Sequence, residues 1–483
     1  MKFNFDNTYT SLPTEMFSVC KPTPVNKPQL VVFNQQLAEE LGIDPKSDSS
    51  EELAAIFSGN IFFENAANIA QAYSGHQFGH FTRLGDGRAV LLGEQLTPDG
   101  KRFDLQFKGS GTTPYSRNGD GRATLRAMLR EYIISEAMHA LNIPTSRSLA
   151  VVATGEAVYR EQVQEGAVLT RVALSHIRVG TFEHITRFCS PQTLQIFTNY
   201  TINRHYPELI ESENSAVALL KSVMEKQTDL IVNWLRVGFI HGVMNTDNMT
   251  ISGETIDYGP CAFINTYNPE TVYSSIDTGG RYAFGNQANI ALWNLTRLAE
   301  SLLTLIADNT EKAIEKAQEV LNTFQATFEE KYFEMLASKI GIEAIQNKDK
   351  ELINSLLKWM YKNNADYTNT FVEIMYPRKI NDKMYMDETF IQWKTDWKNR
   401  LIEVGINPEL ALKTMQSANP VYIPRNYQVE KVLNSVSESG ITQALEEFMQ
   451  RLSTPYTTYE LDINYMLPPL NSEEKNYKTY CGT

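Results

Sequence analysis

The stretch HGVMNTDN, from His241 to Asn248, decides how this chain is interpreted, together with IDYG, from Ile256 to Gly259. The segment before it, WLRVG, has the pattern of a helix that ends at Gly238. Between the two stretches, MTI and ETI are joined by a Ser-Gly pair and predict a small hairpin. This hairpin would bring Asp257 close to the loop that ends at Asn248.

These loops contain two oxygen ligands suited to Mg²⁺, the amide of Asn248 and the carboxylate of Asp257. Mg²⁺ usually takes one or two protein oxygens and completes its shell with water and phosphates. The aliphatic Val243 stands where nucleotide-handling loops of this frame usually have a carboxylate. The alternative is a turn system, rich in Asn and Asp, that binds nothing.

Two candidate phosphate-binding features lie upstream. RLGDGRA places Gly85 and Gly87 before a predicted strand with Arg88 beside them, and glycines let a backbone approach a phosphate closely. RFDLQFK alternates apolar and polar residues, so one face should be buried and Lys108 should lie on the other. A tight turn and a solvated lysine are the alternatives, so neither feature is decisive alone.

The segment RNGDGRATLRAMLREYIISEAMHAL predicts a helix preceded by Asp120 and Gly121. Free N–H groups at a helix start favour an anion, although an Asp there is also an ordinary N-cap. Within the helix, Glu131 and Glu136 are the candidate partners for Lys108. Helical periodicity places Glu136 inside the apolar arc and Glu131 on its edge, which favours Glu136 as the buried carboxylate that needs a cation.

Arg171 and Arg178, in TRVALSHIRVG, are seven residues apart, about two turns if the segment is helical. That spacing would put both guanidinium groups on one face, where they can hold a polyphosphate through bidentate contacts. A solvated face is the alternative. Their position near an inferred boundary between two lobes favours the phosphate interpretation.

Composition sets limits on partners and location. The 483 residues are 42% hydrophobic, enough to bury a full core, and the formal charge of −13 argues against nucleic acid or an anionic membrane as the main partner. No targeting segment or membrane span is evident, which predicts a cytoplasmic protein. A monomer is the expected state. No two cysteines form a CxxC pair, which fits a reducing compartment. The four cysteines are Cys20, Cys189, Cys261 and Cys481.

The pattern is β-like and rich in glycine from Phe78 to Ala153, and mainly helical after Ile185. AVLLGE and RFDLQFK predict two strands joined by a turn at TPDG. We therefore predict an α+β protein with a smaller β-containing N-lobe, including an N-terminal extension, in residues 1–184 and a larger helical C-lobe in residues 185–483. The loops that carry the candidate catalytic and binding residues would lie between the lobes.

The order of these parts resembles that of protein kinases: a Gly-rich turn, a strand lysine, a helix glutamate, a loop with His241 and Asn248, and a D-x-G segment. The resemblance implies a two-lobed kinase-like fold. The kinase catalytic Asp corresponds to Val243, so γ-phosphoryl transfer to a hydroxyl would lack its usual base. Asp247 is the nearby carboxylate that could replace it.

More specifically, the chain resembles the selenoprotein O family of kinase-like proteins over nearly its whole length. The resemblance is densest in AQAYSGHQFGHFTRLGDGRA, FKGSGTTPYSRNGDGRATLR, SEAMHALNIPT, HGVMNTDNM, IDYGP and FGNQ. This family is understood to transfer AMP from ATP to protein hydroxyls, with the nucleotide reversed relative to its orientation in kinases. With the α-phosphate facing the acceptor, a base at position 243 has no role.

The resemblance also implies roles for individual residues. Asp247 would accept the proton of the incoming hydroxyl, and Asn248 with Asp257 would hold Mg²⁺ or Mn²⁺. Glu131, rather than Glu136, would be the partner of Lys108. The expected nucleotide-binding set is Gly85, Gly87, Arg88, Lys108, Asp120, Gly121, Glu131, Arg171, Arg178 and Asp257.

Cys481 matches a C-terminal position that is selenocysteine in some family members and cysteine in others. The resemblance implies a regulatory disulfide with a cysteine near the metal loop, where Cys261 is the only cysteine present. A free thiol in the tail is the alternative.

We therefore expect a Mg²⁺- or Mn²⁺-dependent protein adenylyltransferase that uses ATP and modifies Ser, Thr or Tyr of other proteins and of itself. Two alternatives stay open. A phosphotransferase with Asp247 as its base would transfer the γ-phosphate. An ATP-binding pseudokinase scaffold would bind ATP without forming a covalent product.

Overall fold

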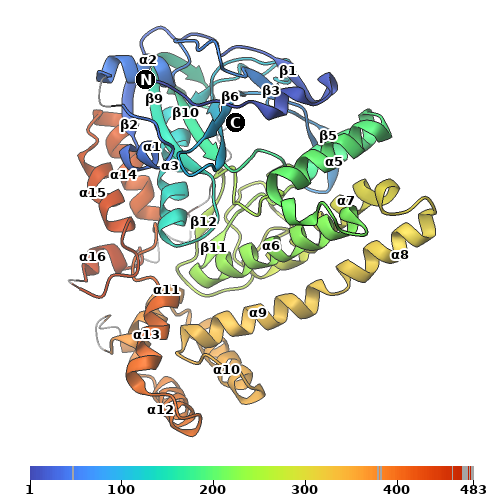
Figure 1. The fold of residues 1–483 in the computed structure, drawn as a ribbon. Helices are drawn as coiled ribbons and strands as arrows, with labels where there is room; N and C mark the ends of the chain where they lie inside the picture. The colour runs from blue at the N-terminus through green and yellow to red at the C-terminus, as the bar shows by residue number, and fades with distance from the viewer. Residues whose placement is uncertain are drawn as a thin grey trace.

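The computed structural model describes residues 1–45, 48–377, 380, 383–459, 461–469, 477 and 479. A sheet-containing N-terminal lobe lies above a larger helical lobe in the view of Figure 1. This architecture confirms the predicted α+β fold with two lobes. The predicted division after residue 184 falls within a helix, α4 (Val179–Phe188), and stays a prediction.

The N-terminal lobe is built on an eight-stranded sheet in the order β1-β3-β6-β7-β10-β9-β2, with β8 paired to β10 and all neighbouring pairs antiparallel. A separate hairpin is formed by β4 and β5, and a short pair by β11 and β12. The strands are β1 (Phe17–Val19), β2 (Gln29–Phe33), β3 (Ile69–Gln71), β4 (Ser74–Gln77), β5 (His80–Arg83), β6 (Ala89–Leu96), β7 (Arg102–Lys108), β8 (Ala123–Thr124), β9 (Arg147–Tyr159), β10 (Val163–Ala173), β11 (Phe239–Ile240) and β12 (Ala262–Phe263).

The α-helices are mainly in the second lobe, as the periodicity predicts. They are α1 (Gln35–Glu40), α2 (Ser50–Phe57), α3 (Leu125–Ala140), α4 (Val179–Phe188), α5 (Pro191–His205), α6 (Ser215–Val237), α7 (Gln287–Ile306), α8 (Thr310–Leu321), α9 (Phe324–Lys339), α10 (Asn347–Asn363), α11 (Tyr367–Met375), α12 (Glu388–Glu403), α13 (Pro408–Ala418), α14 (Asn426–Ser439), α15 (Gln443–Leu452) and α16 (Ile463–Met466). The helices α9, α10, α12 and α13 lie farthest from the sheet in Figure 1.

The central strands β7 and β10 bring two cations together. Lys108 lies opposite Leu169, and Arg171 follows two residues further along β10. Residues directly opposite on antiparallel strands point to the same face, as do residues two apart on one strand. Lys108 and Arg171 therefore share the face of the sheet on which α3 packs.

Both faces of β7 are buried, whereas the alternation of RFDLQFK predicts only one. Leu105 and Phe107 pack in a core cluster with residues of α1 and α2. On the opposite face, Gln106 and Lys108 are 1% and 6% exposed. The alternation correctly predicts that Phe107 and Lys108 point in opposite directions. The polar face is also covered because α3 supplies a carboxylate to Lys108.

The loops that carry the motifs lie between β11 and β12. Helix α6 ends at Gly238, as predicted, with the positive φ of +78° that glycine adopts readily. Strands β11 and β12 then pair, so the two ends of the intervening loop, residues 241–261, lie side by side. Met249 forms an isolated antiparallel bridge with Thr255, which confirms the small hairpin before Asp257.

The β4–β5 hairpin covers the loop that contains Asp247. The main-chain N–H of His76 donates to Oγ1 of Thr246 at 2.7 Å. Helix α4 packs against β4, and the contact leaves no room for a side chain at Gly180. A Cβ at this position would lie 2.0 Å from the carbonyl oxygen of Ser74. The hairpin is thus fixed between α4 and the loop.

Replacing Gly180 with alanine should lower the free energy of unfolding by ~1–3 kcal/mol, because the added methyl group separates α4 from β4. Gly279→Ala is the matched control, since a Cβ there meets no atom of the described residues within 4 Å. Urea-induced unfolding of both variants checks the prediction. Equal stability of the two variants would contradict the close packing of α4 on β4.

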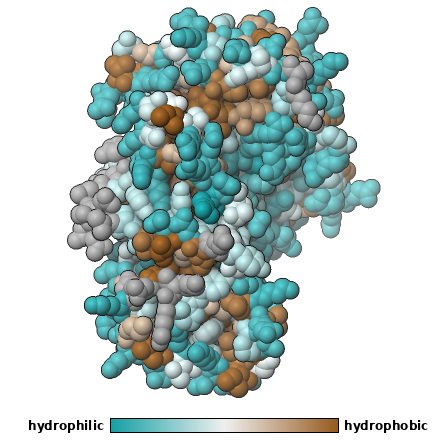
Figure 2. All heavy atoms as spheres, turned by 90° about the vertical axis from the view of Figure 1, so that its left-hand side faces the viewer, coloured by the Kyte–Doolittle hydropathy of each residue, from teal (hydrophilic) through white to brown (hydrophobic). Residues whose placement is uncertain are grey.

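The surface on the left-hand side of Figure 1 is mostly hydrophilic, with hydrophobic atoms gathered in separate patches (Figure 2). Among the helices of the described ranges, none has the length and apolar character needed to cross a membrane.

Candidate active site

Four charged side chains from four parts of the fold meet between the sheet and the loops. Lys108 of β7 lies 2.6 Å (Nζ to Oε2) from Glu131 of α3. Arg171 of β10 lies 2.8 Å from the other oxygen of the same carboxylate. Asp257 accepts hydrogen bonds from Lys108 and, at 2.8 Å, from Nη2 of Arg171. Charges taken out of water are tolerated when they pair, and this cluster matches two cations with two carboxylates.

Electrostatic contacts keep both carboxylates ionised. Burial by itself would raise the pKa of Glu131, but Arg171 and Lys108 outweigh it and lower that pKa. Burial would also raise the pKa of Asp257, but Lys108 and Arg171 hold it well below its usual range. The two carboxylates therefore fix the cations in place, at a position where these can meet an anionic ligand.

Glu131, not Glu136, is the partner of Lys108, so the choice from helical periodicity is wrong and the choice from the family resemblance is confirmed. Glu136 pairs instead with Arg147 of β9, at 2.7 Å. The periodicity correctly identifies Glu136 as a carboxylate that needs a cation. Glu136 lies more than one turn beyond Glu131 in α3. It faces β9 rather than β7 and so meets a different cation.

Arg171 and Arg178 do not share a helix face, so the prediction made from their seven-residue spacing is wrong. Arg171 belongs to a strand, and Arg178 immediately precedes α4. Both guanidinium groups nevertheless reach the loops. Arg171 contacts Asp257, and Nη1 of Arg178 donates to the main-chain oxygen of Asp247 at 3.2 Å.

Asn248 and Asp257 fit a divalent cation. Nδ2 of Asn248 donates to the carbonyl oxygen of Val243 at 3.0 Å, which leaves Oδ1 as a free acceptor. Across the described part of the chain, no group donates to this buried Oδ1. Within the same residues, no group of three or more His, Cys, Asp or Glu side chains is placed so that it could hold a metal ion. A cation held here would thus have few protein ligands, as is usual for Mg²⁺ bound together with phosphates.

Asp247 has the properties of a proton acceptor. It lies in a short 3₁₀ helix, Thr246–Asn248, and is 8% exposed. Burial raises its pKa to about 7, although Arg178 opposes the shift. No donor among the described residues reaches its Oδ1. A carboxylate with a raised pKa and a free oxygen suits general base catalysis near neutral pH.

Asp86 and Tyr73 also belong to this site, although the sequence alone did not single them out. Oδ1 of Asp86 lies 4.0 Å from Nη2 of Arg178, and burial raises the pKa of Asp86 to about 6 against the effect of that arginine. The Arg178 guanidinium lies 4.2 Å from the centre of the Tyr73 ring. The available signal for Asp86 is a carboxylate between two glycines just before the apolar strand β6, since such a carboxylate needs a cation if it is buried.

A cavity of about 60 Å³ opens beside the charge cluster. Arg88 and Lys108 line it from the sheet, and Val243, Asn248 and Asp257 line it from the loops. The site therefore presents cations and metal-ligand oxygens together, with an aliphatic wall at position 243.

Gly85 and Gly87 are required by the packing of the protein itself. A Cβ on Gly85 would lie 2.4 Å from the Tyr115 ring, and one on Gly87 would lie 2.8 Å from the Tyr115 carbonyl oxygen. These contacts explain both glycines without a ligand, so their part in nucleotide binding stays a prediction.

Asp120 does not cap helix α3. Thr124 is the N-cap, and its Oγ1 accepts from the main-chain N–H of Ala127. Asp120 is instead paired with Arg160 at 2.8 Å, with 44% of its side chain exposed. Neither Asp120 nor Gly121 belongs to the described lining of the cavity, so their nucleotide role rests on the resemblance alone.

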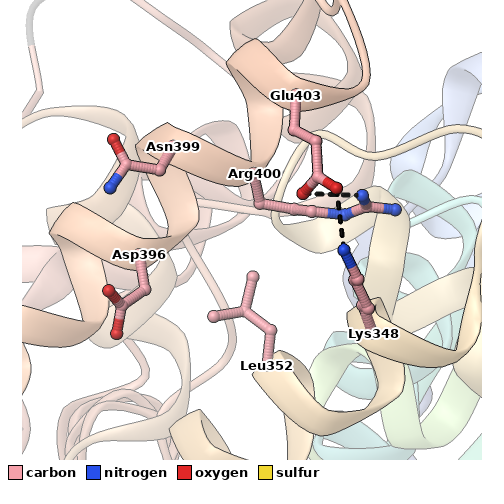
Figure 3. A pocket seen from close by; sticks show the side chains of 6 residues that line it. All are labelled: Lys348, Leu352, Asp396, Asn399, Arg400 and Glu403. Carbon is pink, nitrogen blue, oxygen red and sulfur yellow. Dashed lines mark hydrogen bonds and ion pairs between the residues drawn. The ribbon is translucent and has the colours of Figure 1, made fainter.

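A larger hollow, of about 430 Å³, lies between α10 and α12. Figure 3 shows that three of its charged side chains point toward one another, whereas Asp396 lies apart: Glu403 pairs with Lys348 at 2.8 Å and with Arg400 at 3.1 Å. Asp349 also holds Arg400, at 2.7 Å. Because its cations are paired internally, this hollow is a weaker candidate than the cavity beside Lys108.

Cys481, for which a regulatory disulfide or a free thiol was expected, lies outside the described residues. Cys20, Cys189 and Cys261 are free thiols. Cys261 is buried, and its carbonyl oxygen accepts from Nη2 of Arg130 at 2.6 Å.

Replacing Glu131 with glutamine should lower the free energy of unfolding by ~3–5 kcal/mol, because it leaves buried cations without their shared carboxylate. Glu300→Gln is the matched control. Glu300 is 51% exposed and pairs with Arg297 on the surface, where an ion pair contributes at most ~1 kcal/mol. Urea-induced unfolding measures both changes, and a loss at Glu131 no greater than at Glu300 would contradict the role of the buried cluster.

Comparisons with known proteins cover nearly the whole chain. A family model described as protein adenylyltransferase SelO matches residues 1–453. The chain is 52% identical over its whole length to a protein nucleotidyltransferase YdiU from Nitrosococcus oceani, of which it covers 97%. It is 51% identical, again over its whole length, to the protein of that name from Pelagibacter ubique, of which it covers 99%.

Among solved structures, a similar chain is ROP2 from Toxoplasma gondii, described as a virulence factor with a protein-kinase fold and no enzymatic activity. The likeness covers 69% of this chain and 87% of ROP2, with 9% identity and a TM-score of 0.24. This value is too low to support a conclusion about fold or activity. The match to the family model and the identity to the relatives are decisive: the chain belongs to the protein adenylyltransferase SelO family.

Proposed function

We propose that this protein transfers AMP from ATP to the hydroxyl groups of Ser, Thr or Tyr in proteins, including its own chain. The observation that carries the proposal is the cluster in which Glu131 and Asp257 hold Lys108 and Arg171, together with the buried Asp247, whose pKa the charge of Asp257 helps to raise. Membership of a family described as protein adenylyltransferases supports the same reaction.

The fixed cations would bind the phosphates of ATP. Arg88 and Lys108 line the cavity, and Arg171 lies behind them on Asp257. Cations that are already held in position stabilise phosphate charge without reorganising during the reaction. Gly85, Gly87, Asp120 and Gly121 would complete the nucleotide-binding set.

Asn248 and Asp257 would hold Mg²⁺ or Mn²⁺ through their side-chain oxygens. A cation bound there neutralises charge on phosphate oxygens and on the departing diphosphate. The unpartnered Oδ1 of Asn248 and the ionised carboxylate of Asp257 support this assignment.

The two residues Arg178 and Asp247 favour a reversed orientation of ATP, with the α-phosphate toward the acceptor. Val243 provides no base at the kinase position, whereas Asp247 provides a carboxylate whose main chain is held by Arg178. The acceptor oxygen forms a bond to the α-phosphorus, and the bond from that phosphorus to the oxygen bridging to the β-phosphate breaks. Diphosphate leaves, and the acceptor proton passes to Asp247.

The test is incubation of the purified protein with divalent metal, a mixed protein extract and ATP labelled at the α- or the γ-phosphate. Only the α label should become covalent. Asp247→Asn should lower its incorporation ~10²–10⁴-fold, since a positioned base contributes about that factor. Asp257→Ala should remove the metal-dependent signal.

Asp396→Asn, at an exposed carboxylate of α12, is the matched control and should leave incorporation unchanged. Covalent γ label would contradict AMP transfer and identify a kinase that uses Asp247. Stabilisation by ATP without label of either kind would identify a non-catalytic scaffold.

A further inference from the structure

The β4–β5 hairpin forms the wall beside Asp247. The main-chain N–H of Phe78 donates to Oδ1 of Asn245 at 3.0 Å, and the hydroxyl of Tyr282 donates to the same oxygen at 2.7 Å. A Cβ on Gly75 would lie 2.6 Å from a carboxylate oxygen of Asp247. A protein segment that brings a hydroxyl to Asp247 therefore passes close to this hairpin.

The outer side of the hairpin carries arginines stacked on aromatic rings. The guanidinium of Arg187, on α4, lies 4.7 Å from the centre of the Phe81 ring. That of Arg83, on β5, lies 5.0 Å from the Phe188 ring. Both arginines are exposed, and Phe188 is 46% exposed. A guanidinium that lies over a ring is attracted to it and can still use its N–H groups to bind an anion.

The same arrangement continues onto α7. The guanidinium groups of Arg281, which precedes α7, and of Arg297, on α7, lie 4.8 Å and 5.0 Å from the centre of the Trp293 ring. The ring of His76 connects the two halves, because it contacts both Trp293 and Phe81 at 5.2 Å and 5.4 Å. We call the whole set the arginine–aromatic surface: Phe81, Arg83, Arg187, Phe188, Arg281, Trp293 and Arg297.

This surface concentrates positive charge on a protein whose formal charge is −13. Arg297 has a carboxylate partner, Glu300, at 2.8 Å. Arg83, Arg187 and Arg281 take part in none of the salt bridges found in the described ranges, and their contacts are with rings. Within the described residues, these three guanidinium groups beside the acceptor wall thus have no carboxylate within salt-bridge distance.

We propose that the arginine–aromatic surface binds an acidic segment of the protein substrate, close to the residue whose hydroxyl is modified. This inference rests on the proposed protein adenylyltransferase function and names the class of substrate. Guanidinium groups bind carboxylates through paired N–H donors, and the rings cover the apolar parts of the segment. The surface would therefore select acceptors by the charge of their flanking residues.

The extent of the surface favours a short acidic segment over a nucleic acid. A nucleic acid strand carries a negative charge about every 3.4 Å along its axis, so it would extend beyond the surface. Outside this surface the protein has a large excess of acidic residues, which repel a long polyanion. A protein segment can confine its charge to the few residues next to the acceptor.

The test uses two fluorescein-labelled peptides of equal length with a central serine. One is flanked by Asp and Glu, and the other by Asn and Gln. Fluorescence anisotropy without ATP should give about tenfold tighter binding of the acidic peptide, and the difference should shrink with added salt. Arg187→Glu should weaken binding of the acidic peptide about tenfold, because a like charge replaces the guanidinium.

Arg451→Glu is the matched control, because Arg451 is 47% exposed and also lies over a ring, that of Tyr465, but belongs to α15. It should leave peptide binding unchanged. Equal binding of the two peptides, or equal effects of the two substitutions, would overturn the proposal. So would single-stranded RNA of the same charge that binds more tightly than the acidic peptide.

Transfer of the α label from ATP separates this proposal from the proposed function. We expect Arg187→Glu to raise KM for the acidic peptide about tenfold and to leave kcat for the Asn/Gln peptide unchanged. Label transfer that ignores flanking charge would contradict the docking surface and leave AMP transfer standing. Charge-selective binding without any label from the unaltered protein would contradict AMP transfer and leave the binding surface standing.

Discussion

The buried pairing of Lys108 and Arg171 with Glu131 and Asp257 is the interaction on which the rest of the structure depends. The four side chains come from β7, β10, α3 and the loop after α6, so the cluster forms only when both lobes are assembled. Its charges are tolerated only because each has a partner. The same pairing that joins the lobes also holds Lys108 in the lining of a cavity, with Arg171 behind it on Asp257.

The site differs from that of a conventional kinase at the position of the catalytic base. The lysine, the helix glutamate and the two proposed metal ligands all line one cavity, as the proposed binding of nucleotide and metal requires. Only the base position is changed, to Val243, and the carboxylate that stands ready lies four residues further on, at Asp247. Arg178 and the β4–β5 hairpin pack against Asp247. In the proposed reversed orientation of ATP, the α-phosphorus rather than the γ-phosphorus faces the acceptor.

Features that depend on near neighbours in the chain could be predicted from the sequence. The helix α3, the end of α6 at Gly238 and the turn between β6 and β7 follow from periodicity and turn residues, and the structure contains all three. The pairing of Glu136 with Arg147 could not be predicted, because the cation comes from a strand that periodicity in α3 does not reveal. The family resemblance supplied Glu131 where local pattern did not.

The approach of Arg171 and Arg178 to the loops was predicted for the wrong reason. Their spacing suggested one helix, whereas the structure uses the pairing of β10 with β7 and the start of α4. Long-range strand pairing leaves no local signature in one sequence, and the same holds for the β4–β5 hairpin that covers Asp247. Hence the candidate site residues could be predicted from the sequence more readily than the surface that surrounds them.

The most direct measurement is a crystal structure of the protein with Mn²⁺ and an ATP analogue that cannot be cleaved between the α- and β-phosphates. The account predicts that Asn248 and Asp257 ligate the metal and that the α-phosphate lies nearest to Asp247. A nucleotide with its γ-phosphate nearest to Asp247 would contradict the reversed orientation and, with it, the explanation of Val243.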